Sequence, residues 1–349
     1  MCWDTFLPFW PCVVLIRSDM AAAASISSSS SFTLRADKHV HFSPHRSCSY
    51  RKPSRRRHVS AAAAASSSSS SLSSFRPCID IHGGKVKQIV GASLQDNDAT
   101  ATLENFSTDD KPSTFATKYR DDQLPGGHVI MLGKSQENAD AARDALVAFP
   151  GGLHVGGGIT DESAAEWIEA GASHVIVTSY AFTDGMIDLD KLARLRDAVG
   201  KERVVIDLSC KRVPSSDATT TSESSESSLD DASNPYCVCI DRWQTVTDVR
   251  PFFDDWLARL AEYCDEFLVH AVANEGLRGG IDEDLVRLLA ATSPIPVTYA
   301  GGVRDVSDLE RFYEVCEGKV DVTVGSALDI FGGELKYDDV VDWHKRLRM

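Results

Sequence analysis

Two aspartates in matching surroundings are the residues of this sequence best suited to acid–base chemistry. Asp80 lies in the apolar run CIDIH and Asp207 in the run VVIDLS, near the end of each. Apolar neighbours can raise the pKa of one carboxyl so that it holds a proton at neutral pH while the other stays ionised. Such a pair can serve as general acid and general base on one substrate. The alternative is that each aspartate satisfies loop backbone or pairs with a lysine such as Lys85.

Glycine-rich turns after other apolar runs are candidate anion sites. Glycine lets the backbone approach a ligand without a Cβ in the way, and a helix beginning there directs free N–H groups at the same spot. Four such turns form two similarly spaced pairs, with residues Gly157, Gly158, Thr178 and Ser179 in the first and Gly301, Gly302, Gly325 and Ser326 in the second. The pairing indicates a two-fold repeat and an elongated ligand with a phosphate at each end. For a single turn, turn formation alone is an equally good explanation.

The elements that must position these residues alternate regularly. Eight short runs rich in β-branched residues predict strands, at residues 77–82, 128–133, 153–157, 174–179, 204–209, 266–271, 296–302 and 321–326. Eight amphipathic segments predict helices, at residues 113–122, 138–149, 161–171, 187–199, 255–265, 282–292, 306–317 and 337–348. The alternation predicts an α/β fold, a (β/α)8 TIM barrel with a half-barrel two-fold repeat. Strands 1 and 5 of such a barrel are opposite, so Asp80 and Asp207 face one mouth. An open doubly wound sheet is the alternative, but no dinucleotide fingerprint follows the first strand.

Two segments do not fit the barrel pattern. Residues 1–74 are Ala/Ser-rich blocks around an Arg-rich middle, with nine lysines and arginines against three aspartates. That composition is typical of a disordered organelle transit peptide, which either Met1 or Met20 could begin. Residues 213–235 form an acidic, Ser-rich tract without periodicity, which predicts a disordered insertion in the loop after the fifth strand that tolerates deletion. Residues 75–349 then form a single barrel domain.

Charge and cysteine usage exclude several classes of function. The formal net charge is −15 and the acidic excess lies in the barrel portion, so bulk charge does not favour nucleic acid or an anionic membrane. No apolar stretch has the length of a membrane span. Cys237 and Cys239 form a C-x-C pair, but no second pair follows at zinc spacing. We therefore expect no metal, no cofactor, no nucleic acid and no membrane partner, and a monomer that binds a small bis-phosphorylated substrate.

Several of these motifs together resemble one enzyme family. The segments PCIDIHGGKVKQIVG, HVGGGIT, VIVTSYAF, VVIDLSC, DRWQ, EFLVHAVANEGLRGGIDEDLV, TYAGGV and VGSALDIF are similar to the eukaryotic, plant-type phosphoribosylformimino-aminoimidazole-carboxamide ribotide isomerases of histidine biosynthesis. The resemblance covers residues 75–349 apart from the insertion. It implies an Amadori rearrangement of a bis-phosphoribosyl aminoaldose to the aminoketose. With the Ser/Ala-rich leader, it favours the plastid (the chloroplast stroma) over the mitochondrion as the destination.

The resemblance also implies roles for individual residues. Asp207 occupies the position of the acid that protonates the furanose ring oxygen, and Asp80 that of the base that removes the C2 proton. Trp243 matches an indole that stacks on the substrate's imidazole, although it could instead be an ordinary loop anchor. Gly91 and Gly276 match glycines of phosphate-binding loops.

His270 departs from the bacterial members, which have threonine at this position. It could polarise or bind the substrate, or be a satisfied buried histidine. Thr160 stands where bacterial members have arginine after GGGI. Two other functions stay open: the cyclase of imidazole-glycerol-phosphate synthase, which shares the barrel and the aspartate pair, and an inert phosphosugar-binding barrel. The sequence shows no glutaminase portion or G-x-C-x-G turn in support of the cyclase, and the retained aspartates argue against an inert barrel.

Overall fold

The computed structural model describes residues 73–89, 104–213, 235–252 and 255–349. Every element below belongs to the second of the chain's two units, residues 65–349. Gly91, the leader up to residue 72 and the insertion from 214 to 234 lie outside the described residues.

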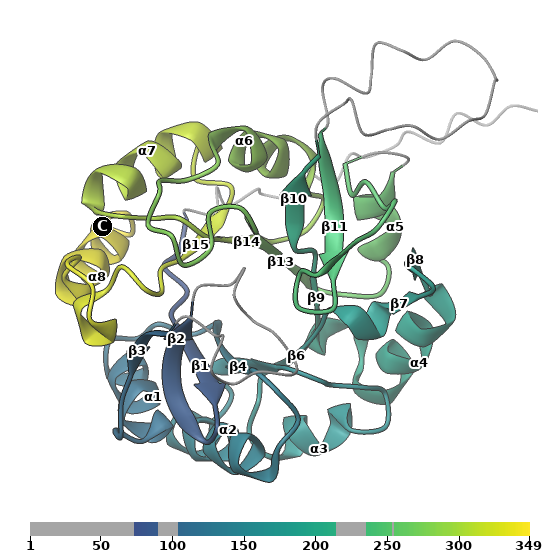
Figure 1. Cartoon of the computed structure of the whole chain (residues 1–349), viewed down its shortest axis with the longest axis horizontal. Coiled ribbons are helices and arrows are strands. Elements are labelled where there is room, and N and C mark those ends of the chain that lie inside the picture. Colours follow the sequence, from purple (N-terminus) through teal and green to yellow (C-terminus); the bar gives the residue numbers. More distant parts are fainter. Residues whose placement is uncertain (1–72, 90–103, 214–234, 253–254) are drawn as a thin grey trace, which may run out of the picture. The chain divides into compact units, whose positions relative to one another are not determined.

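Eight parallel strands form a closed barrel at the centre of this second unit (Figure 1). In spatial order they are β1 (Cys78–His82), β4 (Gly127–Met131), β5 (Leu153–Gly156), β6 (His174–Val177), β9 (Val204–Asp207), β13 (Glu266–His270), β14 (Val297–Ala300) and β15 (Asp321–Thr323). The ring closes where Phe75 pairs with Val322 and the N–H of Arg76 donates to the Val322 carbonyl at 2.9 Å. Each strand falls where the sequence predicted it, so the TIM barrel is confirmed, with β1 and β9 opposite each other.

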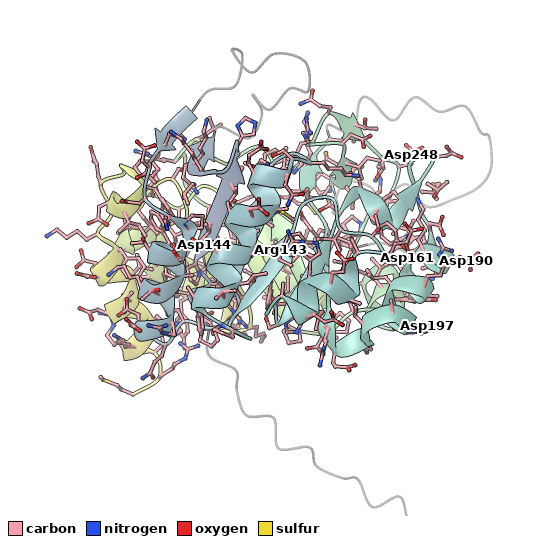
Figure 2. The ribbon with its side chains drawn as sticks, turned by 90° about the horizontal axis from the view of Figure 1, so that it is seen from below. Arg143, Asp144, Asp161, Asp190, Asp197 and Asp248 are labelled. Atoms are coloured by element: carbon pink, nitrogen blue, oxygen red, sulfur yellow. The ribbon has the colours of Figure 1, made fainter. Side chains whose placement is uncertain are left out.

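An outer ring of helices covers the sheet (Figure 1). They are α1 (Pro112–Asp121), α2 (Gln136–Ala148), α3 (Ala164–Glu169), α4 (Leu189–Val199), α5 (Trp256–Leu260), α6 (Glu283–Thr292), α7 (Val306–Cys316) and α8 (Tyr337–Arg346). Charged side chains such as Arg143 of α2 and Asp190 of α4 lie on the outer surface (Figure 2). Two helices are shorter than predicted: α3 begins only after a turn in which Thr160 N–H donates to the Ser163 hydroxyl, and α5 ends at Leu260, five residues before its predicted end. None of the described helices is long and apolar enough to cross a membrane.

Short strands and 3₁₀ turns, which the sequence did not predict, lie in the loops between the barrel elements. They are β2 (Lys85–Ile89), β3 (Glu104–Ser107), β7 (Phe182–Thr183), β8 (Met186–Ile187), β10 (Cys210–Arg212), β11 (Tyr236–Ile240), β12 (Thr245–Val246) and the 3₁₀ turns η2 (Ser179–Ala181), η3 (Lys201–Arg203) and η4 (Asp329–Phe331). β2 and β3 extend the sheet antiparallel from β1, and β10, β11 and β12 form a separate sheet after β9. The chain leaves this small sheet after Val213 and rejoins it at Pro235, whose carbonyl accepts the N–H of Val213 at 2.7 Å.

Polar side chains fill the barrel interior near the amino ends of the strands. Arg76 lies 2.7 Å from Asp321 and 3.8 Å from Glu266. His154 and His174 pair across β5 and β6, and burial lowers the pKa of both, which keeps them neutral. Toward the carboxyl ends, an apolar cluster closes the interior and consists of Ile130, Ile176, Val205, Leu268 and Ala300. Polar chemistry that must reach solvent is therefore confined to the mouth above this cluster.

Candidate active site

A cavity opens at the carboxyl ends of the barrel strands. Its volume of about 660 Å³ suits a small-molecule ligand. Asp80 at β1 and Asp207 at the end of β9 both line this cavity, as expected from the sequence, and His270 joins them from the end of β13. Glu275 in the loop after β13 and Trp243 in the loop between β11 and β12 complete the polar part of the wall.

Asp80 is held by a glutamine from the adjacent hairpin. The Nε2 of Gln88 donates to Asp80 Oδ2 at 2.8 Å, and Gln88 is buried. Burial raises the pKa of Asp80 to about 7; the charge of Glu275 adds to the rise, whereas His270 and the Gln88 bond oppose it. A carboxyl of this pKa can both accept and return a proton near neutral pH. Lys85, the alternative partner suggested by the sequence, pairs with a different, exposed carboxylate.

Asp207 is buried and receives donors on both carboxylate oxygens. The Thr178 hydroxyl donates to Oδ2 at 3.2 Å, and the Ser209 hydroxyl donates to Oδ1 at 3.1 Å. Nδ1 of His270 lies 3.1 Å from the same Oδ1. Each of these partners can approach as a donor, which is the environment that an ionised carboxylate takes.

His270 carries a positive charge beside Asp207. Burial by itself lowers the pKa of His270, but the charge and hydrogen bond of Asp207, with the charges of Glu275 and Asp80, raise it to about 9. The neighbouring His128 of β4 behaves in the opposite way, since burial and the charge of His270 lower its pKa to about 3. The two rings lie 6.4 Å apart between centroids. At neutral pH the mouth thus holds one imidazolium and one neutral imidazole.

Trp243 is presented by a turn of unusual backbone conformation. Asp241, Arg242 and Trp243 have φ angles of 52°, 55° and 65°, so three successive side-chain-bearing residues lie in the left-handed region. The indole Nε1 donates to the Ser209 hydroxyl at 2.8 Å, and the ring centroid lies 5.8 Å from that of His270. This bond and the ring contact hold the indole against the acid–base group.

The glycine turns lie in two groups on opposite sides of the ring of strands. Gly157, Gly158, Thr178 and Ser179 line the main cavity, and Gly276, Gly301, Gly302, Gly325 and Ser326 line a smaller hollow that adjoins it at Asp80 and His270. A Cβ on Gly157 would lie 2.2 Å from the Met131 carbonyl oxygen, and one on Gly302 would lie 2.1 Å from that of Gly280. Both glycines have positive φ, so the turns themselves require glycine whether or not a ligand binds.

Each group includes a cationic side chain that the sequence analysis did not select. Lys134, from the loop after β4, lies across Gly158, where an added Cβ would meet the lysine Cε at 2.8 Å. Arg278 lines the smaller hollow on the other side. The Ser179 hydroxyl accepts the N–H of Asp241 at 3.0 Å, which ties the Trp243 turn to the first group.

Three further residues escaped sequence reasoning. Glu275 lies in both cavities, and burial raises its pKa. The sequence could have indicated Glu275, because this residue directly precedes Gly276 in the loop after a predicted strand. Ser209 follows Asp207 at the two-residue spacing that returns a side chain to the same face of a strand. Gln88 gave no such signal, since its contact depends on the β1–β2 hairpin.

The described part of the chain offers no arrangement of ligands for a metal ion. No group of three His, Cys, Asp or Glu side chains is suitably placed among residues 73–89, 104–213, 235–252 and 255–349. Cys237 and Cys239 both lie on β11, where both side chains are buried.

Comparison with known proteins relates this geometry to one family. A family model described as histidine biosynthesis protein matches residues 75–336. A chloroplastic 1-(5-phosphoribosyl)-5-((5-phosphoribosylamino)methylideneamino) imidazole-4-carboxamide isomerase from Medicago truncatula is 50% identical over 278 residues, covering 79% of this chain and 83% of the relative. The isomerase of the same chemical name from Neurospora crassa is 46% identical, covering 79% of this chain and 100% of the relative. That from Saccharomyces cerevisiae is 41% identical, with 79% and 99% covered.

Proposed function

The chain belongs to the histidine biosynthesis protein family, and on that basis we propose that its barrel mouth catalyses the isomerisation for which its relatives are named. The protein is an isomerase that converts a bis-phosphoribosyl aminoaldose into the corresponding aminoketose. One observation carries the proposal: Asp80 and Asp207 face one cavity from opposite strands, between two glycine-lined groups that can each take a phosphate. The small substrate is bound by a single chain.

Asp207 lies on the side of the cavity from which the acid delivers its proton. A proton delivered from this side to the furanose oxygen breaks the bond from that oxygen to C1, and the nitrogen on C1 supplies the electron pair. The sugar opens to a protonated imine with a free hydroxyl. The neighbouring donors Thr178 and Ser209 fix the carboxylate so that it faces the cavity.

Asp80 serves as the base in the second half of the reaction. Its carboxylate removes the proton from C2, and the electrons move toward nitrogen to form an enolamine. The same carboxyl then returns a proton to C1 while the enol hydroxyl proton goes back to the acid side, so that no net proton is consumed. With a pKa of about 7, Asp80 is available both as base and as returning acid near neutral pH. Each such transfer contributes on the order of 10²–10⁴-fold in rate.

The remaining residues bind the ends and the middle of the substrate. One phosphate binds at Gly157 and Gly158 with Lys134, and the other at Gly301 and Gly302 with Arg278, because backbone N–H groups and a cation together favour an anion. The remaining members of the two groups, Thr178, Ser179, Gly276, Gly325 and Ser326, complete these ends, as does Gly91. Trp243 stacks on the imidazole, and no cofactor or metal enters the reaction.

The decisive experiment is turnover of the purified aminoaldose by the full chain. We expect conversion without ammonia or glutamine, and a loss of at least about 10²-fold in kcat for Asp80→Asn and for Asp207→Asn with near-UV circular dichroism unchanged. Ring closure that depends on ammonia would support the cyclase instead. Binding without turnover by the unmodified chain would support the inert barrel.

We further propose that the leader within residues 1–74 directs the protein to the plastid and is then cleaved upstream of Ser73, because Ser73 is buried and its hydroxyl donates to the Val320 carbonyl of the barrel. The Ala/Ser- and Arg-rich composition and the chloroplastic relative from Medicago truncatula support this destination over the mitochondrion. Import into isolated chloroplasts, followed by sequencing of the mature amino terminus, tests it. Import into mitochondria alone, or a mature chain that retains residues 1–74, would contradict it.

A further inference from the structure

Hydrogen-bond donors face both carboxylate oxygens of Asp207, which disfavours a proton on the carboxyl group itself. The indole N–H of Trp243 can only donate, so the Ser209 hydroxyl that accepts it has its own proton free to point at Asp207 Oδ1. The Thr178 hydroxyl donates to the other oxygen. An acid that must protonate the ring oxygen therefore needs a second group to hold the proton.

His270 is placed to be that second group. Its Nδ1 lies 3.1 Å from Asp207 Oδ1, its side chain is 14% exposed, and it lines the same cavity. We propose that the proton for ring opening is stored on His270 and reaches the ring oxygen through Asp207, so that the pair forms the acid. This inference rests on the proposed isomerisation and assigns the source of its first proton. Because His270 acts through Asp207, it is a positioning and proton-storing residue.

The charges that face His270 favour the stored proton. Carboxyl groups approach from three directions: Asp207 on β9, Asp80 on β1 and Glu275 in the loop after β13. Burial opposes the charges of these three carboxyl groups and the hydrogen bond to Asp207, and the pKa of His270 settles at about 9. His128 on β4 stays neutral and adds no competing charge, and the uncharged Trp243 ring lies 5.8 Å from the His270 ring between centroids.

The transfer balances without any outside reagent. The Nδ1–H bond of His270 breaks as Asp207 Oδ1 takes the proton, and a carboxyl O–H bond breaks as the ring oxygen takes one. The C1–oxygen bond opens, leaving His270 neutral and Asp207 ionised. When the enolamine becomes the ketone, the enol hydroxyl proton returns by the same route and His270 is an imidazolium again.

Substitution of His270 by asparagine separates storage from simple positioning. The amide of His270→Asn keeps an N–H donor near Asp207 Oδ1 but cannot hold the extra proton. We expect the unmodified enzyme to have an alkaline limb near pH 9, where His270 would lose its proton. In His270→Asn we expect kcat/KM to fall by about 10²-fold or more and this limb to disappear. Near wild-type kcat/KM with an unmoved alkaline limb would overturn the proposal, because a hydrogen bond alone would then suffice. Loss of that limb in Glu275→Gln but not in His270→Asn would also overturn it and make Glu275 the acid.

A titration that needs no turnover keeps the inference separate from the proposed reaction. Imidazole nitrogen NMR of the full chain, with the His270 signal assigned by its absence in His270→Asn, should show a protonated ring at pH 8. In Asp207→Asn the same ring should be neutral at pH 8, because its main stabilising charge is gone. A neutral His270 at pH 8 in the unmodified chain would overturn proton storage. If the chain failed to turn over the aminoaldose yet showed both titrations, the proposed reaction would fall while the stored proton would stand.

Discussion

The indole nitrogen of Trp243 lies 2.8 Å from the hydroxyl oxygen of Ser209, and that hydroxyl in turn donates to Asp207 at 3.1 Å. A loop residue that is expected to cover the substrate is therefore joined to the acid side of the reaction by one side chain. If the Trp243 turn moves away, Ser209 loses the donor that orients its hydroxyl. The position of the loop and the readiness of Asp207 are coupled through this single bridge.

The bridge predicts non-additive effects of two substitutions. Ser209→Ala removes the hydroxyl that connects Trp243 to Asp207. Trp243→Phe removes only the indole N–H and keeps an aromatic ring. Each hydrogen bond contributes about 0.5–1.5 kcal/mol, so we expect each variant to lose about 3–10-fold in kcat. The double variant should be little worse than either single one, because both break the same path. Steady-state kinetics of the three variants checks this, and fully additive losses would show that the two residues act independently.

Gln88 predicts a shift in the pH dependence of the base. Its Nε2–H stabilises the ionised form of Asp80, whose pKa is about 7. Gln88→Met removes the donor with little change of volume, so the pKa of Asp80 should rise. The base must be ionised to act, and activity increases with pH through this value. The acidic limb of kcat/KM should therefore move to higher pH, with the largest loss below pH 7 and recovery at pH values above the raised pKa of Asp80. The exposed Gln136→Met on α2 is the matched control, and an equal loss at every pH would contradict the assignment.

Lys134 predicts a defect confined to binding. Its side chain lies across Gly158 in the first glycine group, which is proposed to bind a phosphate and not the atoms whose bonds change. Lys134→Met keeps the aliphatic stem and removes the cation, so we expect KM to rise about 10-fold with kcat nearly unchanged, because a phosphate contact is equal in ground and transition states. Lys201→Met, at the amino end of β9, is the control and should have no effect. A fall in kcat at unchanged KM would place Lys134 in the chemistry rather than at the phosphate.

The framework of the site could be predicted because a few rules fix it. Eight strands in one ring place the first opposite the fifth, so the spacing of Asp80 and Asp207 along the sequence was enough to bring them to one mouth. Positive φ at Gly157 and Gly302 likewise agrees with glycine as the turn residue in both halves. These features follow from periodicity and backbone sterics, which are local properties of the sequence.

The side chains that tune the chemistry could not be predicted in the same way. Gln88 reaches Asp80 only because β1 turns back on itself as a hairpin, and the sequence suggested one strand there. Trp243 reaches Ser209 because three successive residues, Asp241, Arg242 and Trp243, have a left-handed backbone. Residues with side chains rarely adopt this conformation, and their types in the sequence do not indicate it. Lys134 lies over Gly158 because two neighbouring loops meet in space. Such contacts depend on strand register and loop path, which the periodicity of the sequence does not determine.

We predict that the catalytic barrel does not need residues 214–234, which follow β9 and β10. Val213 and Pro235 are joined by a hydrogen bond of 2.7 Å, so the chain can pass between them through a two-residue turn. Replacing residues 214–234 by Asn-Gly, which favours such hairpin turns, should leave kcat and KM within about two-fold, and shortening the connection should keep or slightly raise the urea midpoint of unfolding. The matched control extends the deletion to remove Arg212 and Tyr236, which bind the carboxylates at the start of α6. That variant should lose stability and activity together, since the sheet that carries Trp243 is no longer held. If the shorter replacement were as damaging as the longer one, the tract itself would be part of the active enzyme.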